Sequence, residues 1–411
     1  MKTNLTFILM LLLGINFLNA SEKTSIQNFD VKPGNSPAVN KINLQKAIDW
    51  ASISGAALFV EPSEEPYYID GGIILKKNVS LIGVHGPTHR GTVHKTKKQP
   101  VGSVFAITDK ENAFITVETA TQIKGIQFWY PEQTIKDPNA IIPYKATIKV
   151  SQTSRAQGVY LSCLTFYGEY LAFDFNATRD NACELMTFEH CYGYPLSGEF
   201  IRMDYVYDVP RILHCHVNPA AQRFIGGQFS RDVVDAVIAK KTFAYTINHT
   251  DNAQIIDLFT FGTYGGILLG SESYGQLTNF NFDCVAVGIL KRGSNSKNRN
   301  WQIAQGSIIA NTGEKVENIH PIIIEGKGHT SLSNVEAFSG GNGALTTVPE
   351  NSSWDYLLVR GDSKLTVSIW GSRMRNYISD SPITIENENA IIHVVGCFDK
   401  EEELYNKTFG N

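Results

Sequence analysis

Three aspartates in the middle of the chain occupy similar places in a recurring pattern of two strands joined by a polar stretch. Asp180, Asp208 and Asp251 each lie in or just after that polar stretch. Hydrolysis of a glycosidic bond needs a carboxylic acid that protonates the leaving oxygen and a second carboxylate that activates water or attacks the sugar. The sequence therefore predicts these three side chains as catalytic, with Asp208 and Asp251 as the preferred pair.

Other polar and aromatic residues of the same region are predicted to contact substrate. Arginine and histidine can hold or orient a sugar, and flat rings can stack on it. The predicted substrate-binding residues are Arg202, Arg211, His216, Tyr245, His249 and Glu272, together with Trp129 from a long loop over residues 129–145.

A lyase would use a different set of groups. It needs a base, for which Arg211 or His249 is available, and a cation that neutralises a uronate carboxylate. Calcium is therefore expected only if the reaction is a lyase reaction. The sequence predicts no other cofactor and leaves the identity of any metal ligands open.

Each of these polar residues also has a structural explanation. An aspartate after a strand often satisfies nearby backbone N–H groups, and aromatic residues of a loop often pack against the core. Residues 217–242 read as an insertion between two coils. Within it, RDVVDAVIAKK (231–241) has the pattern of a short amphipathic helix, which would wall one side of a groove.

The elements that position these residues repeat along the chain from about residue 145. Examples are LAFDF (171–175) with LMTF (185–188), FIRMDY (200–205) with RILHC (211–215), and FAYTIN (243–248) with IIDLFTF (255–261). Short strands in coils of about 20–25 residues, without helical crossovers, are typical of a solenoid whose coils stack in parallel. A sandwich of hairpins is disfavoured because two-residue Asn-Gly or Asp-Gly turns are lacking.

Two further patterns support the stacking. Aligning the later strands on their closing residues places Arg292, Glu325, Arg360 and Glu386 in one outward column of alternating sign. Near the N-terminus, Asn43 is predicted to cap a helix that continues to about Ser52 and ends before Gly55. Such a helix would cover the apolar end of the first coil.

The first twenty residues have the order of a secretory signal peptide. A short polar start is followed by the apolar stretch FILMLLL (7–13) and by the small residue Ala20 before Ser21. We therefore expect cleavage after residue 20 and one domain over residues 21–411, in a secreted or periplasmic protein. No later stretch approaches the roughly 20 apolar residues of a membrane span, so membrane insertion is not expected.

Composition excludes several classes of protein. The formal net charge of −4 gives no general attraction to nucleic acid. The six cysteines are spread over more than 230 residues without a CxxC pair, so they predict neither a zinc site nor a dense disulfide scaffold, and most should be buried.

The segment LQKAIDWASISGAALFVEPSEEPYYIDGGIILKKNVSLIGVHG (44–86) resembles the opening of pectin-lyase-like β-helix proteins. In that superfamily of pectate lyases, polygalacturonases and rhamnogalacturonase-like enzymes, a helix and a series of short strands cap the first coil. The resemblance implies an all-β fold, a single-stranded right-handed parallel β-helix with an N-terminal capping helix. It also implies lysis or hydrolysis of a polysaccharide, with non-catalytic adhesins and structural proteins as the minority.

The chain departs from the catalytic motifs of that superfamily. It lacks Asn-Thr-Asp followed by an Asp-Asp pair, Gly-His-Gly, Arg-x-Lys and Arg-x-Pro-x-x-Arg. The expected function is an exported carbohydrate-active enzyme that hydrolyses glycosidic bonds with paired carboxylates. A polysaccharide lyase and a non-catalytic glycan-binding β-helix are the alternatives. The expected partner is a poly- or oligosaccharide, and association into a homo-oligomer is open.

Overall fold

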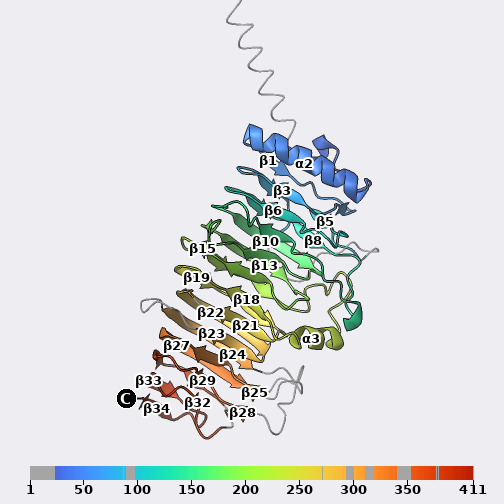
Figure 1. Ribbon diagram of the computed structural model, residues 1–411. Helices are drawn as coiled ribbons and strands as arrows, with labels where there is room; N and C mark the ends of the chain where they lie inside the picture. Colours follow the sequence, from blue (N-terminus) through green and yellow to red (C-terminus); the bar gives the residue numbers. More distant parts are fainter. Residues whose placement is uncertain are drawn as a thin grey trace, which may run out of the picture.

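The computed structural model describes residues 24–86, 88, 98–270, 272–292, 300–310, 318–339, 353–375, 377 and 379–410. Within these residues the chain winds into an elongated stack of coils, with one helix at the N-terminal end and short strands at the other (Figure 1). The signal peptide predicted for residues 1–20 lies outside the described residues. No helix in the described part combines the length and the apolar character needed to cross a membrane.

Two long sheets form the sides of the stack. The first, called here the short-strand sheet, has eleven strands: β3 (Ile73–Leu75), β6 (Ile115–Val117), β9 (Ile148–Val150), β11 (Phe173–Asn176), β14 (Ile201–Asp204), β18 (Phe243–Ile247), β21 (Gly265–Leu269), β23 (Val287–Lys291), β26 (Ile322–Glu325), β29 (Leu357–Arg360) and β32 (Ile383–Ile385).

The second, called here the bent sheet, has nineteen strands: β1 (Ala57–Phe59), β2 (Tyr67–Tyr68), β4 (Ser80–Ile82), β5 (Val104–Ala106), β7 (Gln122–Lys124), β8 (Gln127–Trp129), β10 (Tyr160–Tyr167), β13 (Thr187–Gly193), β16 (Arg211–Leu213), β17 (His216–Val217), β19 (Ala253–Ile256), β20 (Phe259–Phe261), β22 (Gly275–Val285), β24 (Trp301–Ala310), β27 (Gly328–Ser339), β30 (Leu365–Trp370), β31 (Arg373–Met374), β33 (Ala390–Phe398) and β34 (Leu404–Phe409). Two small sheets pair β12 (Cys183–Glu184) with β15 (Val206–Tyr207), and β25 (Asn318–Ile319) with β28 (Ser353–Trp354).

The strands pair in parallel with the next coil, as the repeat predicts. In the short-strand sheet Phe173 lies opposite Ile148 and Ile201, and Ile201 lies opposite Tyr245. These side chains point inward and are fully buried, so each coil covers the apolar surface of its neighbours. The exception is β34, which pairs antiparallel with β33 at the C-terminal end.

A sharp corner divides the bent sheet along its length. At this corner one residue of each successive coil has a left-handed backbone, from Gly125 through Cys163, His190, His214, Asp257, Asn279, Gln305 and Asn334 to Gly371 and Gly396. The left-handed conformation turns the strand sharply while its neighbours keep their parallel pairing. Because it is unfavourable for most residues, the stacked coils must hold it in place.

A helix covers the N-terminal end of the stack. Helix α2 (Pro37–Ser54) begins earlier than the predicted cap at Asn43, because Ser36 accepts a hydrogen bond from Val39 N and Pro37 occupies the first turn. It ends at Gly55, as predicted. The other helices are the 3₁₀ turns η1 (Ile26–Phe29) and η2 (Pro138–Ala140) and helix α3 (Arg231–Ile238).

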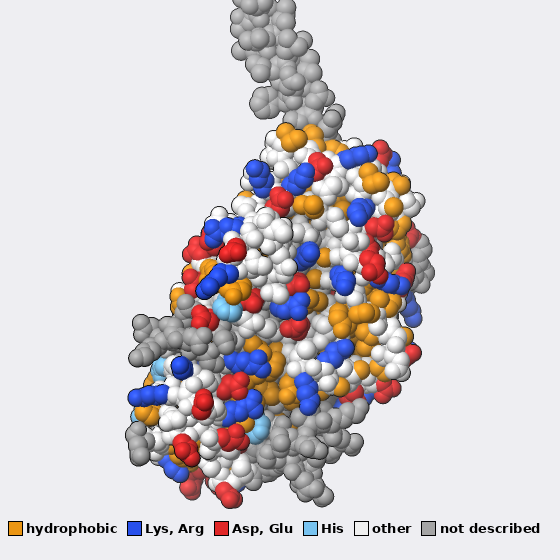
Figure 2. Space-filling view, in the orientation of Figure 1, with side chains coloured by type: hydrophobic (Ala, Val, Ile, Leu, Met, Phe, Trp, Pro, Cys, Tyr) orange, Lys and Arg blue, Asp and Glu red, His pale blue; other side chains and the backbone are white. Residues whose placement is uncertain are grey.

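The predicted outward column of charges forms ion pairs. Glu325 lies 3.3 Å from the Arg292 Nε and 2.8 Å from the Arg360 Nε, measured from its two carboxylate oxygens. The cysteines are free thiols, and four of the six are buried, as expected. On the face shown in Figure 2, basic and acidic side chains alternate without a large region of one sign.

Candidate functional site

A polar pocket lies on the outer face of the short-strand sheet, beside strands β9, β11, β14 and β18. The outward residues Lys149, Asp174, Arg202 and Thr246 stand in register on β9, β11, β14 and β18. Neighbouring strands are about 4.8 Å apart, so these side chains lie side by side along the stack. Of these four residues, Asp174 and Arg202 line the pocket and place an acidic and a basic side chain at its floor.

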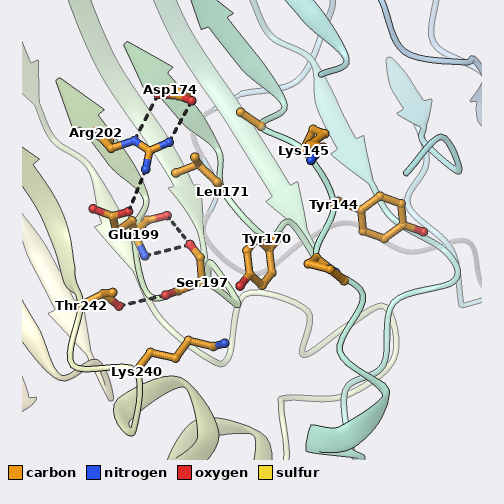
Figure 3. Close-up of a pocket in the computed structure, with 12 residues that line it drawn as sticks. Tyr144, Lys145, Tyr170, Leu171, Asp174, Ser197, Glu199, Arg202, Lys240 and Thr242 are labelled. Atoms are coloured by element: carbon orange, nitrogen blue, oxygen red, sulfur yellow. Dashed lines mark hydrogen bonds and ion pairs between the residues drawn. The ribbon is translucent and has the colours of Figure 1, made fainter. Parts of the chain in front are cut away.

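Arg202 joins two carboxylates in this floor (Figure 3). Its Nε and Nη2 donate to the two oxygens of Asp174 at 3.1 and 2.9 Å, a bidentate fork. Its Nη1 lies 3.5 Å from Glu199 Oε2, and Thr246 Oγ1 donates to Glu199 Oε1 at 2.9 Å. Burial lowers the pKa of Arg202, but the hydrogen bonds and charges of Asp174 and Glu199 outweigh it and raise the pKa.

Two insertions build the wall of the pocket and hold each other. The first carries η2, and the second carries α3, whose buried residues Val233, Val234, Val237 and Ile238 confirm the predicted amphipathic helix. Ser230 caps α3, and it also donates from its N to Ile135 O at 2.8 Å and from its Oγ to Lys136 O at 3.1 Å. Lys240 and Thr242, which follow α3, line the pocket, so the end of the predicted insertion over residues 217–242 contributes to the wall while α3 itself does not line it.

The pocket has a volume of about 530 Å³, enough for one or a few sugar rings. It is lined by Pro143, Tyr144, Lys145, Ala146, Tyr170, Leu171, Asp174, Ser197, Glu199, Arg202, Lys240 and Thr242. Tyr170 is part exposed and presents a ring, and the Lys240 Nζ lies 5.5 Å from the centre of that ring.

The basic side chains of the pocket are not all neutralised. Arg202 is paired with two carboxylates, whereas Lys145 and Lys240 have no ion pair with a described residue. Both lysines are exposed at the rim. The pocket therefore combines a carboxylate pair at its floor with unpaired positive charge at its opening. Among the described residues, no three His, Cys, Asp or Glu side chains are arranged to hold a metal ion.

Of the residues predicted from the sequence, Arg202 alone lines this pocket. Asp180, Asp208 and Asp251 lie instead along the turns that lead from the short-strand sheet into the bent sheet, called here the turn edge. Asp180 and Asp208 are exposed, and Asp251 is part exposed with a buried Oδ1 that has no hydrogen-bond partner. The three share this edge, as predicted. Thr250 forms a parallel β-bridge with Val206, so the residue after it, Asp251, lies beside Tyr207. Asp251 is therefore offset by one position from Asp208.

The other predicted residues divide between that edge and the bent sheet. His249 and Glu272 lie in turns of the edge. Arg211 and His216 lie on the outer face of β16 and β17, where Arg211 donates to Val209 O and the His216 ring stacks on Phe259. These residues do not meet Arg202, because the two sheets face different directions.

Two aromatic residues predicted to bind substrate, Tyr245 and Trp129, lie outside the pocket. Tyr245 is fully buried in the column that contains Ile201, and its hydroxyl donates to Phe259 O, so its side chain packs in the core and does not meet a ligand in solution. Trp129 is part exposed on β8 and lies outside the pocket. The tyrosines of the same loop, Tyr130 and Tyr144, are buried with ring centres 4.7 Å apart.

Sequence reasoning missed four residues of the pocket: Asp174, Glu199, Tyr170 and Lys240. The pairing of Asp174 with Arg202 was available in principle, because both occupy the outward position of successive strands. Glu199, Tyr170 and Lys240 lie in connecting segments, whose path over the sheet is not encoded in the strand alternation.

Comparison with known proteins gives the fold its name. No protein-family model and no curated protein sequence matches the chain. Solved structures match over nearly its whole length. They include bacteriophage phi29 gene product 12 (12% identity, TM-score 0.58, 94% of this chain and 54% of that chain) and the Acinetobacter phage vb_AbaP_AS12 gp42 tailspike (9%, 0.57, 93% and 64%). A third is DFA-IIIase from Arthrobacter chlorophenolicus A6 in complex with DFA-III (10%, 0.54, 93% and 96%).

These neighbours are right-handed parallel β-helix proteins, and this chain has the same fold. The chain spans about half the length of the phi29 protein and less than two thirds of the tailspike. At identities of 9–12% the likeness concerns the fold alone.

Proposed function

We propose that the chain is an exported carbohydrate-active enzyme whose pocket binds sugar residues and hydrolyses a glycosidic bond. The observation that carries the proposal is the pair of carboxylates, Asp174 and Glu199, held by one guanidinium at the floor of a pocket beside the ring of Tyr170. The fold neighbours support it, because they include a mannuronan C-5 epimerase, a bacteriophage tailspike in complex with a pentasaccharide, and DFA-IIIase in complex with DFA-III.

We propose a different role for each carboxylate, and their contacts support it. Asp174 has both oxygens fixed by Arg202, so it is the positioned carboxylate that would activate water or stabilise the developing charge on the sugar. Glu199 is held by one hydroxyl and a longer contact of 3.5 Å, so it has freedom to reach the glycosidic oxygen as the acid. Tyr170 would stack on a sugar ring at the wall.

The rim of the pocket favours an anionic substituent on the glycan. Lys145 and Lys240 carry positive charge without an acidic partner among the described residues, and Lys240 is held over the aromatic face of Tyr170. A carboxylate or sulfate group on the sugar would form ion pairs with these two lysines. Neutral and anionic polymers therefore belong in the same assay panel.

The test measures release of reducing ends and of unsaturated products from such a panel by the purified chain. Glu199→Gln removes the acid while it keeps the side-chain size. Glu325→Gln is a matched control, because Glu325 also pairs with arginines and its side chain is 23% exposed, against 18% for Glu199. Asp251→Asn tests the pair predicted from the sequence in the same experiment.

We expect new reducing ends from the parent, a loss of about a hundredfold or more with Glu199→Gln, and no loss with Glu325→Gln. Loss with Asp251→Asn alone would move the active site to the turn edge. Product that absorbs as an unsaturated uronate would replace hydrolysis by the lyase alternative. Tight glycan binding without product from any polymer would leave the non-catalytic alternative.

A further inference from the structure

A histidine and an aspartate form a close pair on the turn edge, away from the pocket. His249 Nδ1 lies 2.7 Å from Asp204 Oδ1, and the imidazole stacks on the Tyr205 ring with centres 4.3 Å apart and planes 7° apart. These two contacts fix both the position and the orientation of the imidazole. No other hydrogen bond to this imidazole occurs within the described ranges, which leaves Nε2 free.

The pair is accessible from solvent and does not lie at the recurring corner of the bent sheet. Three His–Asp pairs occur in the described part of the chain. His320 and Asp355 are 17% and 3% exposed, so that pair is closed to a ligand. His249 and Asp204 are 31% and 24% exposed. The third pair, His214 with Asp257, is more exposed, but it occupies the left-handed corner that recurs in every coil and therefore follows from the fold itself.

Several residues around His249 have a left-handed backbone. Tyr205 and His249 have φ of +52° and +34°, and Val209, a β-branched residue, has φ of +60°. Such conformations are unfavourable for residues other than glycine and tend to concentrate at functional sites. Two residues after His249, the buried Oδ1 of Asp251 has no hydrogen-bond partner in the described structure.

We propose that His249 is the general base of a second catalytic site, with Asp204 as its positioning residue, and that this site hydrolyses an acyl ester. In the step, His249 Nε2 takes a proton from water while the water oxygen bonds to the acyl carbon. The ester C–O bond then breaks, and His249 returns the proton to the departing alcohol. Water and ester thus give acid and alcohol, with no change of oxidation state.

The chemistry of the pair favours an ester over a glycosidic bond. An acetal requires a carboxylic acid for the leaving oxygen, whereas an imidazole oriented by a carboxylate at its other nitrogen is suited to acyl transfer. The neighbouring titratable groups are Asp208 and Asp251 in the same turns, Glu272 in the next turn and Tyr205 beneath the ring. The site lies apart from the pocket, so it does not depend on the function proposed there.

The test uses the whole chain and 4-nitrophenyl acetate as the probe. His249→Gln removes the base, and Asp204→Asn keeps the hydrogen bond but reverses the tautomer of the imidazole. His214→Gln is the matched control from the exposed pair on the corner. Ethoxyformylation of histidines in the parent chain, with the modified residue identified by mass spectrometry, gives a second measurement that needs no variant.

We expect the parent to exceed an equal concentration of free imidazole, and His249→Gln and Asp204→Asn to lose at least about tenfold. The rate of the parent should fall on acidification, because a protonated imidazole cannot accept a proton, and this limb should vanish in His249→Gln. His214→Gln should keep the rate. A parent no faster than free imidazole, equal loss with His214→Gln, or full activity after modification of His249 would each overturn the assignment.

Discussion

At the scale of single residues, the most unusual group is the buried Glu169. It follows the left-handed Gly168, precedes the pocket residue Tyr170, and is fully buried with neither carboxylate oxygen in a hydrogen bond of ordinary geometry. A methyl group on Gly193 would lie 2.2 Å from Glu169 Oε1, so the absence of a side chain there is what admits the carboxyl. Burial raises the pKa of Glu169 to about 8, only partly offset by the backbone N–H groups of Glu169 and Tyr194.

Replacing Glu169 by Gln should therefore change how stability depends on pH. The carboxyl of the unfolded chain ionises near 4.5 and that of the folded chain near 8, so the parent loses stability as pH rises between these values. The full loss should amount to roughly 5 kcal/mol, from about 1.4 kcal/mol per unit of pKa shift. Glu169→Gln should remove this part of the slope of the free energy of unfolding against pH, measured by denaturant unfolding at pH 5 and pH 8. Equal slopes in parent and variant would contradict the buried, neutral carboxyl.

At the scale of elements, the solenoid depends on a corner that most of its residues do not favour. The left-handed corner residues of successive coils, called here the corner ladder, are Gly at both ends of the series and Cys, His, Asp, Asn and Gln between them. Asparagine tolerates this conformation because its short side chain bonds locally, whereas glutamine does not. The ladder therefore stores strain at specific, identifiable positions.

Gln305→Gly should stabilise the chain by about 0.5–1 kcal/mol, because the relief of a left-handed backbone exceeds the extra entropy of an unfolded glycine. Gln305 has φ of +55°, and its exposed side chain receives only a long contact of 3.4 Å from Thr278. Asn279→Gly is the matched control at the same corner, with φ of +55° and a smaller expected gain. Urea unfolding measures both, and a gain at Asn279 equal to that at Gln305 would argue against strain.

At the scale of the whole molecule, function rests on where the chain is delivered and on which outer face meets a polymer. A β-helix buries a continuous core and leaves long flat faces, so insertions such as those carrying η2 and α3 are needed to make a pocket. The predicted leader in residues 1–20 would deliver the chain to the compartment in which polysaccharides occur.

Expression of the full chain in a Gram-negative host should yield a periplasmic or extracellular protein that begins at Ser21. Intact mass spectrometry would show the loss of residues 1–20. Leu11→Arg breaks the apolar stretch and should keep the uncut protein in the cytoplasm, because the stretch becomes too polar to enter the export channel. Uncut parent protein outside the cytoplasm would contradict cleavage at Ala20.

Strand alternation, the coil length and the column from Arg292 to Glu386 were sufficient to predict the stacked β-helix, because each follows from the period of two and the spacing between coils. Helix α3 was also predictable from its own pattern. The candidate site was not. Asp174 and Arg202, which are 28 residues apart in the chain, become partners only when their coils stack, as their hydrogen bonds show. Glu199 and Lys240 lie in connecting segments that bring them to the same pocket. His249 and Asp204 form a hydrogen bond although they are 45 residues apart in the chain.

The sequence by itself determined the fold, since apolar periodicity is a local property that every coil repeats. Tertiary structure alone decided which polar groups meet. A strand fixes whether a side chain faces inward or outward, but the three outer faces of the solenoid are set by turns and by the left-handed corner. Residues close in the repeat, such as Arg202 and Arg211, are thereby sent to different faces, and Tyr245 is sent to the core.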